Sequence, residues 1–207
     1  PPLKIGIDTQ NHQLSLTCLL NKVPLQLLDA NMPDEVTGSF ALHASINDLN
    51  WKTLSELQVH PEHVIDGHML VTLKAPKEPT SLIGGLLQEQ TTFRSRFKLK
   101  STAAFDFTEF SVENSLLRVD GDAHIFPTQE TLQANVKGQF KDLEHFGALF
   151  GKQIKGPLSF STRVDGPFTT PSVHMQINSS HLQLFEHSFT DIQAALKTQY
   201  SKNTLSG

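Results

Sequence analysis

Hydrophobic and polar residues alternate one by one along most of this chain. Between positions 117 and 125 the odd-numbered residues are Leu, Val, Gly, Ala and Ile, whereas the even-numbered residues are Arg, Asp, Asp and His. Successive side chains of a β-strand point to opposite faces, so this period of two predicts strands with one apolar and one polar face. The same alternation predicts strands at 3–9, 13–20, 37–47, 64–74, 92–100, 103–112, 132–140, 158–165, 173–178 and 192–198. The chain is therefore predicted to be all-β, with about a dozen antiparallel strands joined by short turns.

Two short stretches, 24–28 and 143–150, depart from this alternation. Their apolar residues recur at i, i+3 and i+4, which predicts one or two short amphipathic helices. Each stretch precedes a strand that contains a glycine, and these glycines, Gly38 and Gly156, are 118 residues apart (156 − 38). The order of helix, turn and Gly-led strand thus occurs twice. We expect two degenerate units, at about 3–100 and 101–207.

Two segments are predicted to be loop-rich. The segment 75–91 carries two prolines and two glycines, and the segment 48–63 shows no sustained alternation. A β-pattern begins at Leu3, and another still runs at Tyr200. We therefore expect 1–207 to be one continuous β-segment cut from a longer chain, with any targeting or anchoring segment outside it.

A sheet with one apolar face must cover that face. A β-sandwich or a closed barrel covers it with an ordinary core, whereas a long curled sheet leaves it open to a hydrocarbon guest. About a dozen strands at ~4.8 Å spacing make a sheet roughly 55 Å long, and open sheets of more than ~10 strands usually curl or split. Composition alone favours the sandwich, and alternation cannot choose between the two architectures.

The apolar positions of the strands form the candidate site. They carry large aliphatic or aromatic side chains in the apolar register of each strand: Phe93, Phe97, Leu99, Leu117, Val119, Ile125, Leu132, Val136, Phe140, Leu158, Phe160, Val164, Val173, Met175, Ile177, Leu184, Ile192 and Leu196. Small residues between them, such as Gly121, Ala123, Ala134 and Gly138, would leave width for a guest. Cys18 falls in the apolar register of its own strand, where a small buried side chain fits.

Composition agrees with strands that have one wet face. Charged residues make up 18% of the chain, below the usual quarter, and neutral polar residues take their place. The net charge of −4 gives no nucleic-acid footprint, so no nucleic-acid partner is expected. One basic cluster, Arg94, Arg96, Lys98 and Lys100, alternates with apolar residues and fits the wet side of a strand. Binding of phosphate or lipid headgroups by this cluster is the alternative.

Nothing in the sequence points to catalysis. It holds no G-x-S-x-G, P-loop or H-E-x-x-H motif. His60 and His63 have a spacing that could suit a metal ion, but Pro61 indicates a loop and no cysteine accompanies them. Asp120 and Asp122 share one strand face, as on a solvated surface. We therefore expect no enzyme activity, no catalytic residue, no metal site and no cofactor.

A series of motifs between about 105 and 196 carries a resemblance. In order, the motifs span 116–123 (LLRVDGDA), 141–151 (KDLEHFGALFG), 154–160 (IKGPLSF), 164–171 (VDGPFTTP), 179–184 (SSHLQL) and 189–192 (FTDI). Their order resembles the AsmA-like superfamily of bacterial envelope proteins, and most of all the C-terminal region of the TamB family. The region 23–46 resembles the same block more weakly.

The resemblance implies a fold called a β-taco, a long U-shaped sheet with a hydrophobic groove inside. It implies a periplasmic scaffold of a Gram-negative envelope, whose groove conducts phospholipid between the inner and outer membranes. The implied partners are phospholipid acyl chains, an outer-membrane protein of the Omp85 class and an inner-membrane anchor, the last two reached through parts outside this segment. As the alternative role, it implies a translocation and assembly module that helps to insert outer-membrane β-barrels through strand-edge pairing.

Overall fold

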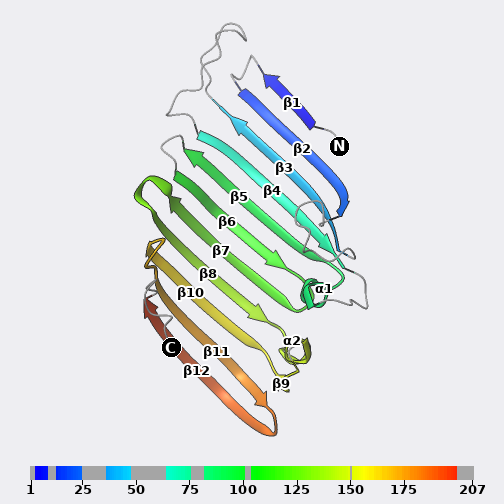
Figure 1. Ribbon diagram of the computed structural model, residues 1–207, viewed down its shortest axis with the longest axis vertical. Coiled ribbons are helices and arrows are strands. Elements are labelled where there is room, and N and C mark those ends of the chain that lie inside the picture. Colours follow the sequence, from blue (N-terminus) through cyan, green and yellow to red (C-terminus); the bar gives the residue numbers. More distant parts are fainter. Residues whose placement is uncertain are drawn as a thin grey trace.

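The twelve strands that the structure describes belong to a single antiparallel sheet (Figure 1). The computed structural model describes residues 3–8, 13–24, 36–47, 64–75, 82–100, 104–149 and 151–199. The strands are β1 (Leu3–Asp8), β2 (Gln13–Pro24), β3 (Thr37–Ile46), β4 (Val64–Lys74), β5 (Thr91–Lys100), β6 (Ala104–Glu113), β7 (Leu117–Phe126), β8 (Thr131–Phe140), β9 (Ile154–Lys155), β10 (Leu158–Pro167), β11 (Ser172–Leu184) and β12 (His187–Gln199). Two short α-helices, α1 (Leu82–Leu87) and α2 (Glu144–Leu149), and the 3-10 turn η3 (Pro127–Gln129) lie between strands.

The sheet is a meander, in which each long strand pairs with the next long strand along the chain. Only β9 leaves this path, since it pairs with β11. The order begins at β1 and ends at β12, and the sheet does not close into a barrel. The predicted long antiparallel sheet is thereby confirmed. The alternative β-sandwich is wrong for the described part of the chain, because a sandwich needs two sheets.

The helices agree with the prediction at one place and differ from it at another. The helix expected at 143–150 is α2, whereas the stretch 24–28 lies outside the described residues. The segment 75–91, predicted to be loop-rich, contains α1. The loop-rich segment 48–63 also lies outside the described residues. None of the helices among the described residues is long and apolar enough to cross a membrane.

Bulges keep the apolar side chains on one face of the sheet. In β6 the apolar positions change from odd to even numbers between Phe107 and Phe110, where the register with β7 shifts. In β2 they change between Leu20 and Val23, where the register with β3 shifts and Lys22 has a φ of 52°. At each of these places the strand holds one extra residue, so the apolar residues that follow it still point to the apolar face although their numbers have changed from odd to even or from even to odd. Without it, the ends of both strands would turn their apolar side chains to the polar face.

The two helices lie near the same ends of the strands, here called the helix rim (Figure 1). Gln88 Nε2, just after α1, lies 2.8 Å from His145 Nε2 on α2. Asn114 holds the end of α1, since its side-chain amide donates to the Leu86 carbonyl at 3.0 Å. The Phe146 ring of α2 lies 5.4 Å from the ring of Phe140 on β8.

Asp142 fixes the start of α2 to the strand region that follows it. Its Oδ1 accepts the backbone N–H of Glu144 and the backbone N–H of Gly156, both at 2.9 Å. The Leu143 N–H donates in turn to the Gly156 carbonyl at 2.9 Å. The start of the 141–151 motif and the glycine of the 154–160 motif are therefore bonded to each other. Gly38, by contrast, lies inside β3 and pairs with Val23 and Leu73, so the two glycines of the expected repeat occupy different surroundings.

Asp142 makes the docking of α2 depend on pH. The N–H groups of Gly156 and Glu144 hold the pKa of Asp142 below its usual value of 3.8. A lowered pKa in the folded state stabilises the fold above the unfolded-state pKa, and this stabilisation is lost as pH falls through the folded-state pKa. We expect Asp142→Asn to lower the melting temperature at pH 7 and to cause no difference from the unmodified protein at a pH well below 3.8. A difference that stays constant from pH 7 to pH 2 in thermal melts would contradict this role.

Candidate functional site

In the strands from β1 to β12, apart from the short β9, most of the large apolar side chains lie on one face of the sheet. Leu19, Ala41 and Leu70, which pair with one another across β2, β3 and β4, lie on the opposite face. Directly paired residues form an unbroken central row from β2 to β12: Cys18, Leu42, Met69, Ser95, Phe110, Gly121, Val136, Thr162, Met175 and Leu196. In β1, Ile5 pairs with Leu16 of the same face. Residues opposite one another in a ladder point to the same face. The apolar faces of neighbouring strands are therefore in phase along the whole described sheet.

The structure brings nearly all of the predicted site residues onto this face. Val119 pairs with Val112 and Gly138, and Val164 pairs with Ala134 and Val173. The exception is Leu184, which follows Ile177 by an odd number of residues. It pairs with His187 and Ile154 at the end of the β11–β12 hairpin. Leu184 therefore does not share the register of the other predicted residues.

Further residues of this face were not among the predicted positions. They come from the amino-terminal strands and from β6, and they include Leu14, Leu16, Leu20, Phe40, Leu42, Ile46, Ile65, Met69, Val71, Phe105, Phe107, Phe110 and Val112. The same alternation is present in their sequence and could have identified most of them. In β6 the bulge between Phe107 and Phe110 breaks the alternation, so the period of two assigns the residues on its two sides to different faces.

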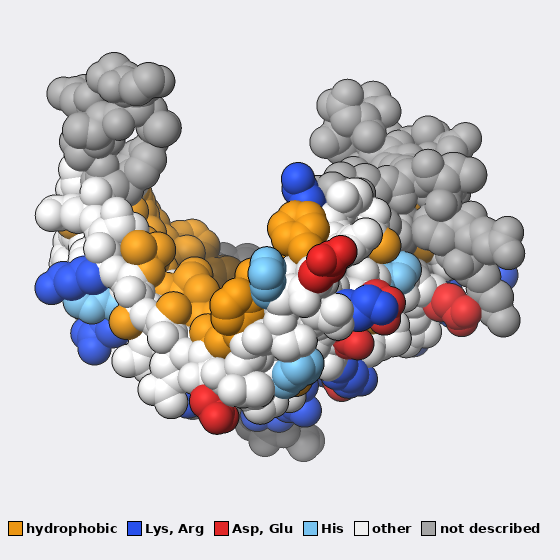
Figure 2. All heavy atoms as spheres, turned by 90° about the horizontal axis from the view of Figure 1, so that it is seen from below, with side chains coloured by type: hydrophobic (Ala, Val, Ile, Leu, Met, Phe, Trp, Pro, Cys, Tyr) orange, Lys and Arg blue, Asp and Glu red, His pale blue; other side chains and the backbone are white. Residues whose placement is uncertain are grey.

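The apolar face is hollow and open rather than packed as a core. Figure 2 shows hydrophobic side chains lining the inside of a U-shaped section, with charged side chains on its outside. Among the described residues, Val36 is the only apolar side chain that is fully buried. On the face itself Ile5 is 66% exposed, Leu196 55% and Phe105 38%. Such a continuous exposed apolar surface is typical of a site that takes an apolar partner.

Phenylalanine rings cover the glycines of this face. Phe110 pairs with Gly121 and Phe160 pairs with Gly138, and in each case the ring occupies the space that a Cβ on the glycine would need. The prediction that these glycines leave width for a guest is therefore wrong. A ring laid over a cross-strand glycine shields the exposed backbone of the sheet instead. The floor of the groove is smooth at these places because the rings fill them.

The covering role of Phe160 can be tested by truncation of its ring. It covers Gly138, and its ring centroid lies 6.3 Å from that of Phe140, which in turn contacts Phe146 of α2. We expect Phe160→Ala to reduce the free energy of unfolding by about 2 kcal/mol, because a half-buried ring is lost and backbone is exposed. Urea denaturation measures this change. An unchanged midpoint would contradict the covering role of the ring.

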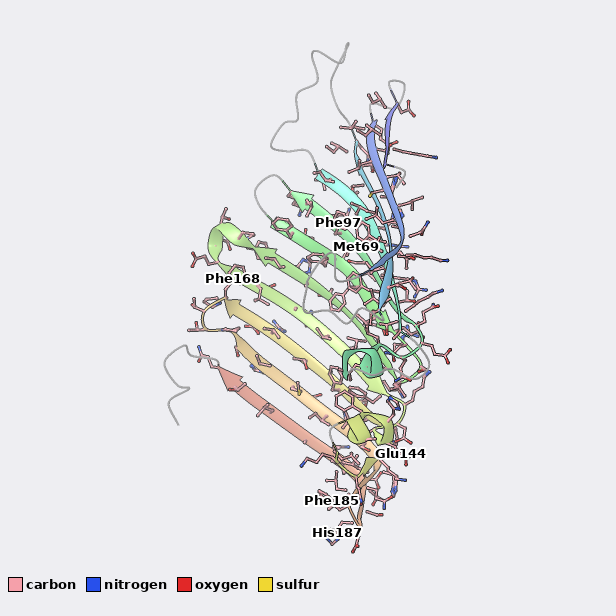
Figure 3. The ribbon with its side chains drawn as sticks, turned by 45° about the vertical axis from the view of Figure 1, so that its right-hand side comes forward. Met69, Phe97, Glu144, Phe168, Phe185 and His187 are labelled. Carbon is pink, nitrogen blue, oxygen red and sulfur yellow. The ribbon has the colours of Figure 1, made fainter. Side chains whose placement is uncertain are left out.

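The opposite face carries charges that are largely compensated. The basic cluster lies on β5, the strand of Phe97, beside β4, the strand of Met69; Figure 3 labels these two residues, which belong to the apolar face. Three of the four cations of that cluster face an acid on a neighbouring strand: Arg96 lies 3.7 Å from Glu109, Lys98 3.4 Å from Asp66 and Lys100 3.2 Å from Asp106. A hydrogen bond with His124, with a further one from Lys100, holds the pKa of Asp106 below its usual value. This arrangement favours a solvated face over an anion-binding site.

The other candidates for chemistry are few. Among the residues that the structure describes, no group of three or more His, Cys, Asp or Glu side chains could hold a metal ion. His60 and His63 lie outside the described residues. Cys18 is half-buried in β2 and pairs with Leu42, in the apolar register that the sequence predicts. Asp120 is bonded by Arg118 at 2.8 Å, as on an ordinary solvated face.

The groove is thus a feature of the described chain that can bind an apolar partner, and it is defined by its geometry alone. Comparisons of the chain with protein-family models, with curated proteins and with solved structures find no match.

Proposed function

We propose that this chain is a segment of a periplasmic scaffold whose apolar groove conducts phospholipid between the inner and outer membranes of a Gram-negative envelope. The observation that supports the proposal is the unbroken apolar face, which crosses every strand of the meander in phase and stays open to solvent. The resemblance of the motifs to the AsmA-like superfamily supports the choice of phospholipid as the guest. The acyl chains lie in the groove, and the headgroup stays in water at its mouth.

The physical reason for such a groove is the cost of moving lipid through water. Each methylene group that leaves water gains about 0.8 kcal/mol, so an acyl chain of ~16 carbons loses on the order of 10 kcal/mol when it is fully exposed. A groove that keeps the chains dry removes most of this barrier. It must offer similar apolar contacts along its whole length, because a deep specific pocket would trap the lipid.

The residues of the groove suit that requirement. The central row consists mainly of aliphatic, aromatic and sulfur-containing side chains with no ion among them. Rings cover the glycines, so the floor has neither holes nor exposed backbone at those positions. In this proposal the chain performs no chemistry and uses no metal or cofactor. Contact with an Omp85-class protein and with an inner-membrane anchor is made by parts outside this segment.

Crosslinking distinguishes the groove from the outer face. Val119, Val136 and Val164 lie on the apolar face. Each has a cation as an immediate neighbour in the sequence, and these cations, Arg118, Lys137 and Arg163, lie on the polar face. We expect photocrosslinkers at the three valines to capture phospholipid in cells, and those at the three cations to capture little. Equal capture at both sets would overturn the proposal. Lipid mass spectrometry of the purified protein gives an independent measurement, with phospholipid as the expected content.

The free edges of the sheet favour a second candidate function. In the described chain β1 and β12 each pair on one side only, and an unpaired edge can add a strand from another protein. An assembly module for outer-membrane β-barrels would use these edges for client strands. Client crosslinks at β12 together with a groove free of lipid would select this function. Phospholipid at the valines selects the conduit.

A further inference from the structure

The strand β12 forms a long and accessible edge of the sheet. It has 13 residues, and all of them except Ile192 are exposed. Figure 1 shows it at one end of the meander, where only β11 lies beside it. Edge strands in natural proteins are commonly blunted by proline or by several charges. Within His187–Gln199 there is no proline, and its two ionic side chains, Asp191 and Lys197, have opposite charges.

The sequence of β12 is complementary to itself in one antiparallel register. When two copies pair about Ala194, residue i faces residue 388 − i. Asp191 then faces Lys197 of the second copy, and Ile192 faces Leu196 of the second copy. When the centre is moved to Gln193 or Ala195, Asp191 no longer faces Lys197. When the centre lies between two residues, even-numbered residues face odd-numbered ones, so the apolar face of one copy lies on the same side as the polar face of the other.

The charges needed for this register are available. Among the described residues neither Asp191 nor Lys197 takes part in an ion pair or a side-chain hydrogen bond. Opposite charges that face each other across an antiparallel ladder stabilise the pair, and like charges in that position destabilise it. On the other face, Leu196 is 55% exposed and its burial against Ile192 of a second copy removes apolar surface from water.

We propose that two copies of this chain associate through their β12 edges, antiparallel, about a two-fold axis at Ala194 that is perpendicular to the sheet. The axis keeps both apolar faces on the same side, so the groove continues from one copy into the other. Asp191 has a φ of 52°, which is not a strand conformation. The regular ladder between the two copies therefore runs from Ile192 to Leu196, and one Asp191–Lys197 ion pair lies at each end of it. The association needs no lipid, and its failure leaves the proposed function of the groove untouched.

Charge variants of the whole chain test the proposal by sedimentation velocity across a range of concentrations. We expect the unmodified chain to dimerise with a dissociation constant on the order of micromolar, since two edge strands form a small interface. Asp191→Lys alone and Lys197→Asp alone are each expected to weaken the dimer at least about tenfold, because like charges then face each other. An equimolar mixture of the two single variants is expected to form a heterodimer, and the double variant on its own is expected to form a homodimer, because opposite charges face each other in both cases.

The controls separate this interface from other modes of contact. Lys4→Asp changes a charge on the opposite edge strand and is expected to leave the dimer intact. Circular dichroism of every variant shows that the fold is retained. Four results would each overturn the proposal: a monomer at all concentrations, a dimer that ignores both charge variants, a dimer lost in Lys4→Asp, or growth into long assemblies. Protection of β12 amides in a monomer would show that the chain covers this edge itself, and would overturn it too.

Discussion

Replacing Val136 with aspartate is expected to remove most of the phospholipid that co-purifies with this protein. Val136 is half-buried in β8 and stands in the central row, between Gly121 of β7 and Thr162 of β10. A carboxylate at this point lies in the path of the acyl chains. Burying an ionised carboxylate without a partner costs several kcal/mol, and each 1.4 kcal/mol changes an equilibrium tenfold, so retention is expected to fall by about 100-fold or more.

Matched variants separate the effect on the groove from an effect on the fold. Lys137→Asp places the same carboxylate on the next residue, which is exposed on the polar face, and is expected to leave the bound lipid unchanged. Val136→Thr keeps the shape and adds one hydroxyl, so its effect should fall between the two. In the empty groove the new carboxylate is hydrated, and circular dichroism is expected to show an unchanged sheet. Wild-type lipid content in Val136→Asp would show that the acyl chains do not occupy this row.

The period of two predicted the strands and the sides of most of their residues. It assigned the strands at 64–74 and 92–100 almost to the residue, since β4 spans Val64–Lys74 and β5 spans Thr91–Lys100. It could not predict whether neighbouring strands are in phase, because phase depends on the pairing between strands. The ladder Gly67↔Phe97 and Phe97↔Phe107 supplies that information and could be read only from the structure.

Helix α1 shows why the sequence left part of the fold unpredicted. Its sequence, LIGGLL, contains two glycines, which favour a loop over a helix by local propensity. The contacts that hold its end come from distant residues or from the following strand. Asn114 donates to the Leu86 carbonyl at 3.0 Å, and Thr91 Oγ1 donates to the Leu87 carbonyl at 2.5 Å. Asn114 also accepts the N–H of Leu117 at 2.8 Å, so one side chain joins the helix to the β6–β7 turn.

The helix rim and the opposite rim of the sheet are built differently. Figure 3 shows Glu144, Phe185 and His187 toward one end of the strands and Phe168 at the other. The helix rim holds α1, α2 and the tip of the β11–β12 hairpin, where the Phe185 N–H donates to the Gln153 carbonyl at 2.9 Å. At the opposite rim, among the described residues, β10 and β11 are joined by the short turn between Pro167 and Ser172, and β7 and β8 by η3. The helix rim is held by the bonds around Asp142 and Gly156, so a substitution of Gly156 tests how this rim is built.

Substituting Gly156 with alanine is expected to destabilise the protein by about 4 kcal/mol or more. Gly156 has a φ of 113°, a conformation that side chains with a Cβ rarely adopt. A Cβ at this position would also overlap the backbone carbonyl of His181 on β11. The strand would have to move away, which would break the bonds of Gly156 to Asp142 and Leu143 that dock α2.

Gly166 provides the matched control for this position. It has a φ of 112°, but a Cβ there would meet nothing closer than 3.8 Å. Gly166→Ala therefore carries the conformational cost alone, about 1–3 kcal/mol, and the difference between the two variants isolates the contact with His181. Urea denaturation gives both free energies, and hydrogen exchange of the α2 amides is expected to quicken in Gly156→Ala only. Equal destabilisation by the two substitutions would mean that β11 yields to the added carbon, and that the rim is not held at Gly156.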